Sequence, residues 1–341
     1  MAAVASEWFP STEIFLLAHG LLAVQVFLVL GGYLNAKSLS RVLSDDSLHA
    51  TSRIWARYKR LAIPLFVALS FAVLVTELIR PFFDHNSLSA APTPLQVFAH
   101  VFLLQDILFL EAFSAGVWYV AIDFQLFVIA IACAGLAHAW QRFSETGSVV
   151  RKVLFLWATL TLVSLFVWNL HSLGEIWGTY FLGAYGLGLC IGCWRYANLR
   201  FSHFHLSLMI VFIGALAFAY QPRERLAVAV VTAFFLCLYE AGECKPIEFL
   251  KASWLRNFSD ATYSIFLIHF GVSLLISALV FNFWSENIPI NLMGLLLSFA
   301  LSIWLGRLIQ LHIESKPASL YRLLQWAAIF AASSSAAMWL S

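Results

Sequence analysis

Long apolar stretches alternate with short polar segments along nearly the whole chain. About 20 apolar residues suffice for a helix to cross the hydrocarbon core of a bilayer. Ten stretches approach or exceed this length, at residues 12–36, 62–80, 115–139, 153–171, 175–193, 204–220, 226–242, 262–283, 290–310 and 319–340. Because lipid offers the backbone no hydrogen-bond partners, such stretches are expected to be helical. The pattern predicts an all-α, polytopic transmembrane helix bundle of about ten spans.

One further apolar stretch, residues 97–110, is only about 14 residues long. As a helix it covers about 21 Å, which is short of the hydrocarbon core of about 30 Å. We therefore expect this stretch not to cross. No internal repeat and no linker rich in Pro, Gly or Ser divides the chain. The sequence predicts a single domain over residues 1–341.

The composition supports membrane insertion and excludes a nucleic-acid-binding role. Hydrophobic residues make up 62% of the 341 residues, and charged residues make up 11%. Soluble domains carry roughly 45–50% apolar and about 25% charged residues. The net charge of +2, without a basic stripe, gives no basis for binding nucleic acid.

Basic residues in short loops predict the orientation of the spans. The segment 37–61 contains six of them: Lys37, Arg41, Arg53, Arg57, Lys59 and Arg60. Placing the basic loops in the cytoplasm puts both termini outside, with Arg223 and Arg225 as exceptions that Glu224 partly offsets. An outside N-terminus without a targeting segment suggests that one helix precedes the first span in a longer reading frame.

Ionisable side chains at membrane depth are costly and are candidates for function. In this chain they are His19, Asp106, Asp123 and His269, with Arg60 and Glu314 at the cytoplasmic rim. His269 shares a helix face with Thr262 and Ser273, so this face is expected to point into the bundle. Each candidate has a structural alternative, namely a hydrogen bond that holds two helices together. For Glu314 the sequence favours this alternative, with an arginine of the 53–60 segment as its partner.

Arg53, Arg57 and Arg60 follow a helical spacing that places them on one face, with Lys59 off it. Clustered guanidinium groups suit phosphate recognition, including the phosphates of coenzyme A. The alternative is an anchor on lipid headgroups. Pro64 is expected to open or kink the span that follows. Cys190 and Cys193 form a C-x-x-C pair inside an apolar stretch, and metal-ligand spacing is absent, so helix packing is the expected role of these two thiols.

Five segments, in order, resemble the acyltransferase 3 family of membrane acyltransferases. They are VQVFLVLGGYL at 24–34, RYKRLAIP at 57–64, VWYVAIDFQLF at 117–127, TYSIFLIHF at 262–270 and IESKP at 313–317. Each segment alone is a weak match, but together they cover nearly the whole chain. The carboxylate of the family's third segment is normally a Glu, and this chain has Asp123 there.

The resemblance implies an enzyme of the plasma (inner) membrane that moves an acyl group, often acetyl, from acyl-CoA to a hydroxyl. The implied acceptor is a cell-surface carbohydrate or a lipid-linked carbohydrate, and the other partners are membrane lipids. Acyl-CoA is the only co-substrate implied, and no metal. Arg57 and Arg60, with Arg53 beside them, would bind the CoA phosphates. His19, Asp123 and His269 are the candidate catalytic residues.

One departure from the family concerns the catalytic histidine. The family places it on a helix before the V-L-S-G-F segment, about ten residues after an Arg or Lys. Here that segment already lies in the first span, and no Arg or Lys precedes His19. Either the helix that carries the histidine is absent from this sequence, or His19 acts as the base in a shortened homologue. A transporter or flippase and an inactive homologue are the alternative functions.

Overall fold

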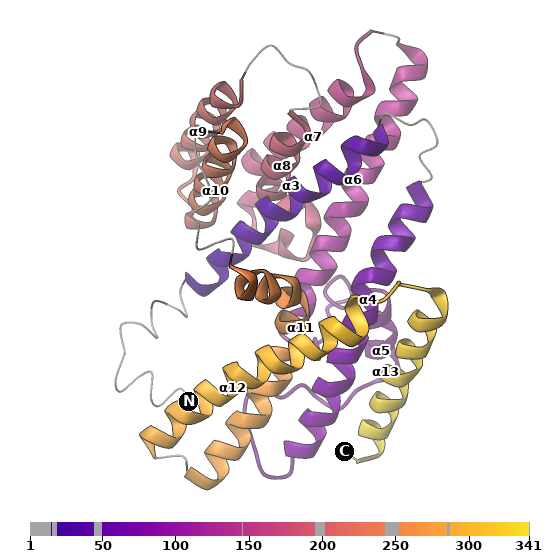
Figure 1. Cartoon of the computed structure of the whole chain (residues 1–341), viewed down its shortest axis with the longest axis vertical. Helices are drawn as coiled ribbons and strands as arrows, with labels where there is room; N and C mark the ends of the chain where they lie inside the picture. Colours follow the sequence, from indigo (N-terminus) through magenta and orange to yellow (C-terminus); the bar gives the residue numbers. More distant parts are fainter. Residues whose placement is uncertain are drawn as a thin grey trace. The chain divides into compact units, whose positions relative to one another are not determined.

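A computed structural model describes residues 15, 19–43, 50–144, 146–194, 202–242, 252–284 and 287–340 of the chain. The basic loops with Arg195, Arg200, Lys245 and Lys251, and the proposed upstream helix, lie outside the described residues. Within the described ranges the regular structure is entirely helical. In chain order (Figure 1) the helices are η1 (Gly20–Leu22), α3 (Ala23–Leu43), α4 (Ala50–Ile79), α5 (Pro94–Val101), α6 (Val117–Phe143), α7 (Val149–Phe166), η2 (Trp168–Leu170), η3 (Ser172–Ile176), α8 (Gly178–Trp194), α9 (His203–Tyr220), α10 (Glu224–Ala241), α11 (Ser253–Trp284), α12 (Ile288–Ile309), η6 (Gln310–Glu314) and α13 (Leu320–Leu340).

Each of the ten apolar stretches contains a helix, which confirms the all-α polytopic fold. In the described part of the chain, seven helical segments are long and apolar enough to cross a bilayer. They are Ala50–Ile79, Val117–Phe143, Val149–Leu170, His203–Tyr220, Leu255–Trp284, Ile288–Glu314 and Leu320–Leu340. The remaining three stretches fall short: the apolar helical part of the first is Gly20–Ala36, α8 has only 17 residues, and α10 carries three charged residues among its 18. The expected "about ten" spans is therefore an approximate number.

Pro64 does not open a helix. It lies inside α4, which already begins at Ala50 and continues to Ile79. A proline at an interior position removes the hydrogen bond from its own nitrogen to the carbonyl four residues earlier, here that of Arg60. The polar segment before Pro64 is therefore helical, and Arg53, Arg57 and Arg60 belong to one helix.

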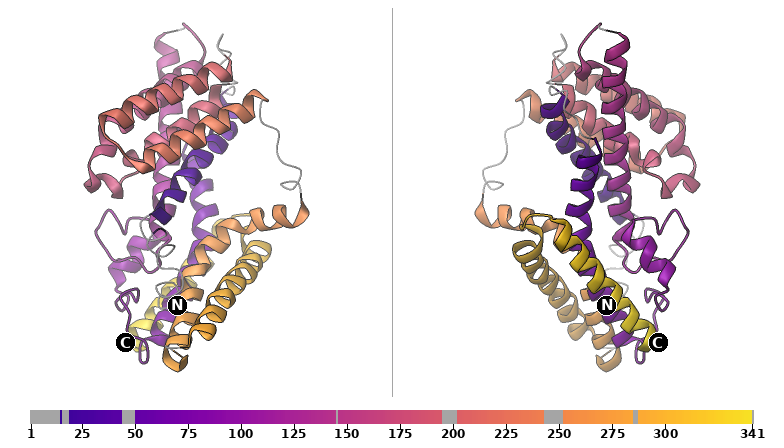
Figure 2. Two further views of the ribbon diagram at one scale, coloured as in Figure 1. Left: turned by 90° about the vertical axis from the view of Figure 1, so that its left-hand side faces the viewer. Right: turned by 90° about the vertical axis from the view of Figure 1, so that its right-hand side faces the viewer.

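The chain divides into two compact units. The first contains Trp55–Ala121 and the chain from Ile247 onward, and the second contains Leu17–Ile54 and Ile122–Pro246. In the first unit, α11 and α12 lie side by side (Figures 1 and 2). The core of this unit joins the end of α4 to α11 through Val75, Ile79, Phe83, Leu274 and Ala278.

In the second unit, glycines bring the backbones of α3 and α8 into direct contact. A Cβ added at Gly188 would lie 1.9 Å from the carbonyl oxygen of Val29, and one at Gly32 would lie 2.0 Å from that of Tyr185. Small residues at such crossings let membrane helices pack closely. The C-x-x-C thiols of Cys190 and Cys193 lie buried and free on α8.

Candidate functional site

A basic pocket of about 340 Å³ lies in the first unit between residues 59–64 of α4, the turn at 313–318 and the first turn of α13. Its charged lining consists of Lys59, Arg60, Lys316, Arg322 and one acid, Glu314. The remaining lining residues are Ile63, Pro64, Ile313, Ser315, Pro317 and Ala318. Four cations against one carboxylate give the pocket an excess of positive charge, which suits an anionic group such as a phosphate.

The π-helical turn η6 forms the wall of the pocket that faces α4. The N–H of Ser315 donates to the carbonyl of Gln310, five residues earlier, at 2.9 Å. Such turns often occur at functional sites. Arg322 donates to the carbonyls of Ile313 at 2.8 Å and Pro317 at 3.1 Å, so its guanidinium is fixed against the turn. The wall is therefore held by backbone contacts rather than by the side chains alone.

Glu314 is oriented by a residue on α11. The hydroxyl of Ser264, which is fully buried, donates to Oε2 of Glu314 at 2.7 Å. The charge of Arg60 also acts on this carboxylate. The sequence expected Glu314 to pair with an arginine of the 53–60 segment; its hydrogen-bond partner is instead Ser264, while Arg60 shares the pocket.

The basic side chains that line the pocket are not the ones that the helical spacing placed on one face. Of the three arginines predicted to bind the CoA phosphates, only Arg60 is on its lining; Arg53 and Arg57 lie on the same helix but outside the lining. Lys59 lines the pocket although the spacing placed it off the arginine face. Lys316 comes from the turn after η6, and Arg322 comes from the first turn of α13. Sequence reasoning missed Arg322, whose position depends on how α13 packs.

His269 lies on α11 and is half-buried. Its Nδ1 is 2.6 Å from the carbonyl oxygen of Phe266, so Nδ1 carries the proton and donates. In a neutral imidazole this leaves Nε2 with a lone pair. On the same helix, Ser273 contacts Ser298 of α12 at 3.0 Å, so this part of the polar stripe joins two helices. His269 is thus in the tautomer that a general base at Nε2 requires.

His19 pairs with a carboxylate that the sequence did not connect to it. Its Nε2 lies 3.3 Å from Oε2 of Glu224, in the first turn of α10. Side chains of both residues are partly exposed. A carboxylate beside a histidine can orient the ring and stabilise its protonated form. The predicted His19 site is therefore a histidine–carboxylate pair in the second unit.

Asp123 is buried on α6 in the second unit, where a Cβ added at Gly31 would lie 3.9 Å from its Oδ1 and 3.8 Å from the Tyr185 ring. Gly31 lies twelve residues after His19, which corresponds to about 18 Å along a helix. The structure therefore places Asp123 in the α3–α8 contact and not beside His19. The nearby Tyr185 hydroxyl accepts from Asn35 at 2.7 Å, so this region is a buried polar layer.

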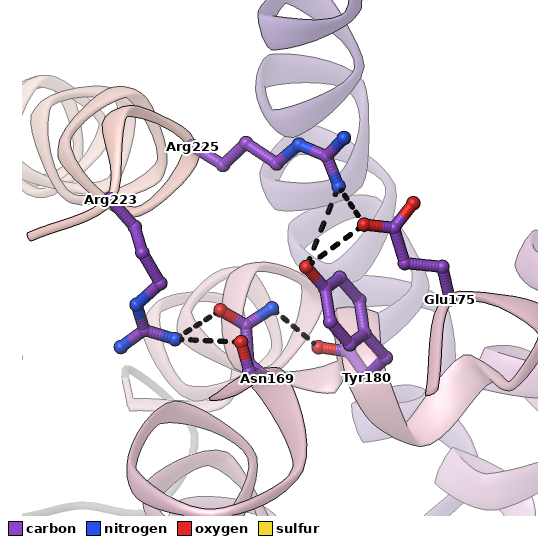
Figure 3. A network of polar contacts seen from close by, with 5 residues as sticks. All are labelled: Asn169, Glu175, Tyr180, Arg223 and Arg225. Carbon is purple, nitrogen blue, oxygen red and sulfur yellow. Dashed lines mark hydrogen bonds and ion pairs between the residues drawn. The ribbon is translucent and has the colours of Figure 1, made fainter. Parts of the chain in front are cut away.

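Arg223 and Arg225 are the two exceptions in the charge pattern, and both form hydrogen bonds within the second unit (Figure 3). Arg225 donates to Glu175 at 2.7 Å. Arg223 donates to the carbonyls of Leu165 at 2.9 Å and Asn169 at 3.1 Å, at the end of α7. A guanidinium satisfies the last carbonyls of a helix and interacts favourably with its dipole. Glu224 was expected to offset these charges, but Glu175 partners Arg225 and Glu224 contacts His19.

Comparison with known proteins gave one match. A family model described as an acyltransferase domain, that of the acyltransferase 3 family, matches residues 2–307. No curated protein and no solved structure matches the chain. The matched range includes α4, α11 and nearly all of α12, and it ends before the pocket wall at η6.

Proposed function

Because the chain belongs to the acyltransferase 3 family and is a multi-pass membrane acyltransferase, we propose that it moves an acyl group, in the first instance acetyl, from acyl-CoA to a hydroxyl group. The acceptor in this proposal is a cell-surface carbohydrate or a lipid-linked carbohydrate. The membrane concerned is the plasma (inner) membrane. The observation that carries the proposal is the basic pocket formed by Lys59, Arg60, Lys316 and Arg322.

The pocket suits the phosphates of coenzyme A for two reasons. First, Arg and Lys form charge-assisted hydrogen bonds to phosphate oxygens, and these are about twice as strong as neutral ones. Second, Arg322 is fixed by two carbonyls, so less side-chain freedom is lost when an anion binds. Arg53 and Arg57, on the preceding turns of α4, extend the positive charge beyond the pocket and are proposed to attract the donor.

The proposed reaction is a direct transfer with a histidine as general base. A neutral imidazole takes the proton of the acceptor hydroxyl while its oxygen attacks the thioester carbonyl. The tetrahedral intermediate collapses as the carbon–sulfur bond breaks, and the CoA thiolate takes the proton from the imidazolium. His269 supports this role because its Nδ1–H is held by a carbonyl and its Nε2 keeps the lone pair. His19 with Glu224 is the alternative base, and Asp123 is proposed to orient a polar group of the acceptor.

Binding of the donor tests the proposal at its pocket. Purified protein in lipid nanodiscs is titrated with CoA, and with pantetheine, which lacks the phosphates. We expect CoA to bind and pantetheine to bind at least about tenfold more weakly, because charge-assisted hydrogen bonds contribute about 1.5–3 kcal/mol each. Arg60→Ala and Lys316→Ala should each raise the Kd for CoA by about tenfold.

Arg256→Ala is the matched control, because Arg256 is exposed at the start of α11 and is not on the pocket lining. This variant should bind CoA as the wild type does. Equal losses in Arg60→Ala and Arg256→Ala would assign the binding to general surface charge. Equal affinity of the wild type for CoA and pantetheine would contradict the phosphate site.

A further inference from the structure

In the segment Ala90–Gly116, between α4 and α6 in the first unit, residues 96–105 have an inverted distribution of polar and apolar side chains. Gln96, His100 and Gln105 are buried, with exposed fractions of 6%, 0% and 0%. Phe98 and Phe102 are exposed at 54% and 49%. In water the opposite arrangement is favourable, because apolar surface is costly to hydrate. In lipid, polar groups face the protein interior and apolar groups face outward.

Two contacts place this segment alongside the membrane-spanning part of α4. The Tyr58 hydroxyl donates to the carbonyl of Val101, at the end of α5. Tyr58 lies 21 residues before the end of α4 at Ile79, which is about 31 Å along the helix. The Phe113 ring lies 6.1 Å from that of Phe330 on α13, and the Phe330 ring stacks at 5.9 Å on Phe66, near the middle of α4.

The segment begins near the opposite end of α4, at Ile79, and runs back toward Tyr58. Arg80, directly after α4, donates to the carbonyl of Ser89 at 2.8 Å, which keeps Ser89 near the Ile79 end. Twelve residues later, Val101 meets Tyr58. Gly116, just before α6, packs against Phe266 of α11, where an added Cβ would lie 3.0 Å from the ring. The segment therefore runs back along α4 between spanning helices instead of forming a loop beyond them.

Most polar groups of the segment have partners within the protein, as the hydrocarbon region favours. The amide of Gln105 donates to Oδ2 of Asp106 at 2.6 Å, whereas its Oε1 is buried without a partner. Glu111 is exposed and accepts from the N–H of Ala90 at 3.0 Å.

The Nδ1–H of His100 donates to the carbonyl of Gln96 at 2.7 Å, and its Nε2 accepts from the N–H of Phe113 at 3.2 Å. The N–H of Leu104 donates to the carbonyl of Ala99 at 2.8 Å. Leu103 and Phe109 have φ angles of 58° and 54°, so the backbone bends sharply just after α5 and again at Phe109.

We infer that Ala90–Gly116 is an intramembrane segment that does not cross the bilayer, and that Leu95, Phe98 and Phe102 contact lipid acyl chains. This exposed face is continuous with the apolar surface of α13, against which α5 packs and whose Leu324 is 60% exposed. Acyl chains are the occupant that the surrounding spanning helices imply. The opposite face carries Gln96, His100 and Gln105 into the interior of the first unit.

Site-directed labelling in membranes tests this placement independently of any catalytic activity. Phe98→Cys and Phe102→Cys are compared with His85→Cys, which is exposed in the loop after α4, and with Leu324→Cys on the spanning helix α13. The wild type sets the background of its native thiols. We expect a membrane-impermeant maleimide to label positions 98, 102 and 324 at least tenfold more slowly than position 85.

A bimane fluorophore at the same positions then identifies what covers them. Phospholipids with a nitroxide on the acyl chain should quench positions 98, 102 and 324 but not position 85. Labelling of positions 98 and 102 at the rate of position 85 would overturn the inference. Protection without quenching at these two positions, when position 324 is quenched, would also overturn it, because a protein surface would then cover them.

Discussion

Two histidines of the first unit have the same proton position but different capacities for chemistry. His100 and His269 both donate from Nδ1 to a carbonyl three or four residues earlier. In His100, however, Nε2 accepts from the N–H of Phe113, so its lone pair is occupied. His100 is therefore a structural residue, whereas Nε2 of His269, the base in the proposed reaction, retains a lone pair when the ring is neutral.

The buried hydrogen bonds of His100 predict a loss of stability when this residue is replaced. His100→Ala leaves the N–H of Phe113 buried without its partner, which costs about 1–3 kcal/mol. Thermal unfolding in detergent measures this loss, and we expect a lower Tm than that of the wild type.

His85→Ala is the control for this experiment, since His85 is exposed in the loop after α4. It should unfold at the same temperature as the wild type. Equal Tm values for His100→Ala and the wild type would contradict a structural role of His100.

At the scale of elements, the sequence predicts helices well and their contacts poorly. All ten apolar stretches contain helices, because lipid leaves the backbone few alternatives. The spacing of Arg53, Arg57 and Arg60 correctly implies a helix, yet Lys59 joins Arg60 in the pocket. The pocket forms because residues 313–322 pack against α4, which lies about 250 residues earlier in the chain. No local pattern in the sequence indicates this contact. The position of Ala90–Gly116 is likewise set by contacts with Tyr58 and Phe330, which no local pattern indicates.

The contact between α3 and α8 depends on a backbone approach that only glycine allows. Gly188→Ala would place a Cβ 1.9 Å from the Val29 carbonyl oxygen, so the two helices would have to separate. We expect the Tm in detergent to fall by at least about 5 °C. Gly135→Ala on α6, where an added Cβ meets nothing within 4 Å, should be neutral or stabilising because alanine favours helices. Equal Tm values for the two variants would refute a tight α3–α8 contact.

For the whole molecule, family membership establishes an acyltransferase, and the basic pocket supports a CoA donor. The candidate residues are distributed over both units: Arg60 and His269 lie in the first, and His19 and Asp123 in the second. Activity therefore needs to be measured on the intact chain. A variant in each unit, His269→Gln and His19→Gln, then distinguishes between the two proposed bases.

The most direct test follows the acyl group itself. Purified protein in vesicles is given acetyl-CoA labelled on the acetyl group, together with cell-surface carbohydrate, and both labelled carbohydrate and free CoA thiol are measured. We predict that label enters the carbohydrate in equal amount to the thiol released, and that Arg60→Ala lowers both about tenfold at subsaturating donor. Transfer of label from a different donor, with no thiol released from acetyl-CoA by the wild-type chain, would contradict the account.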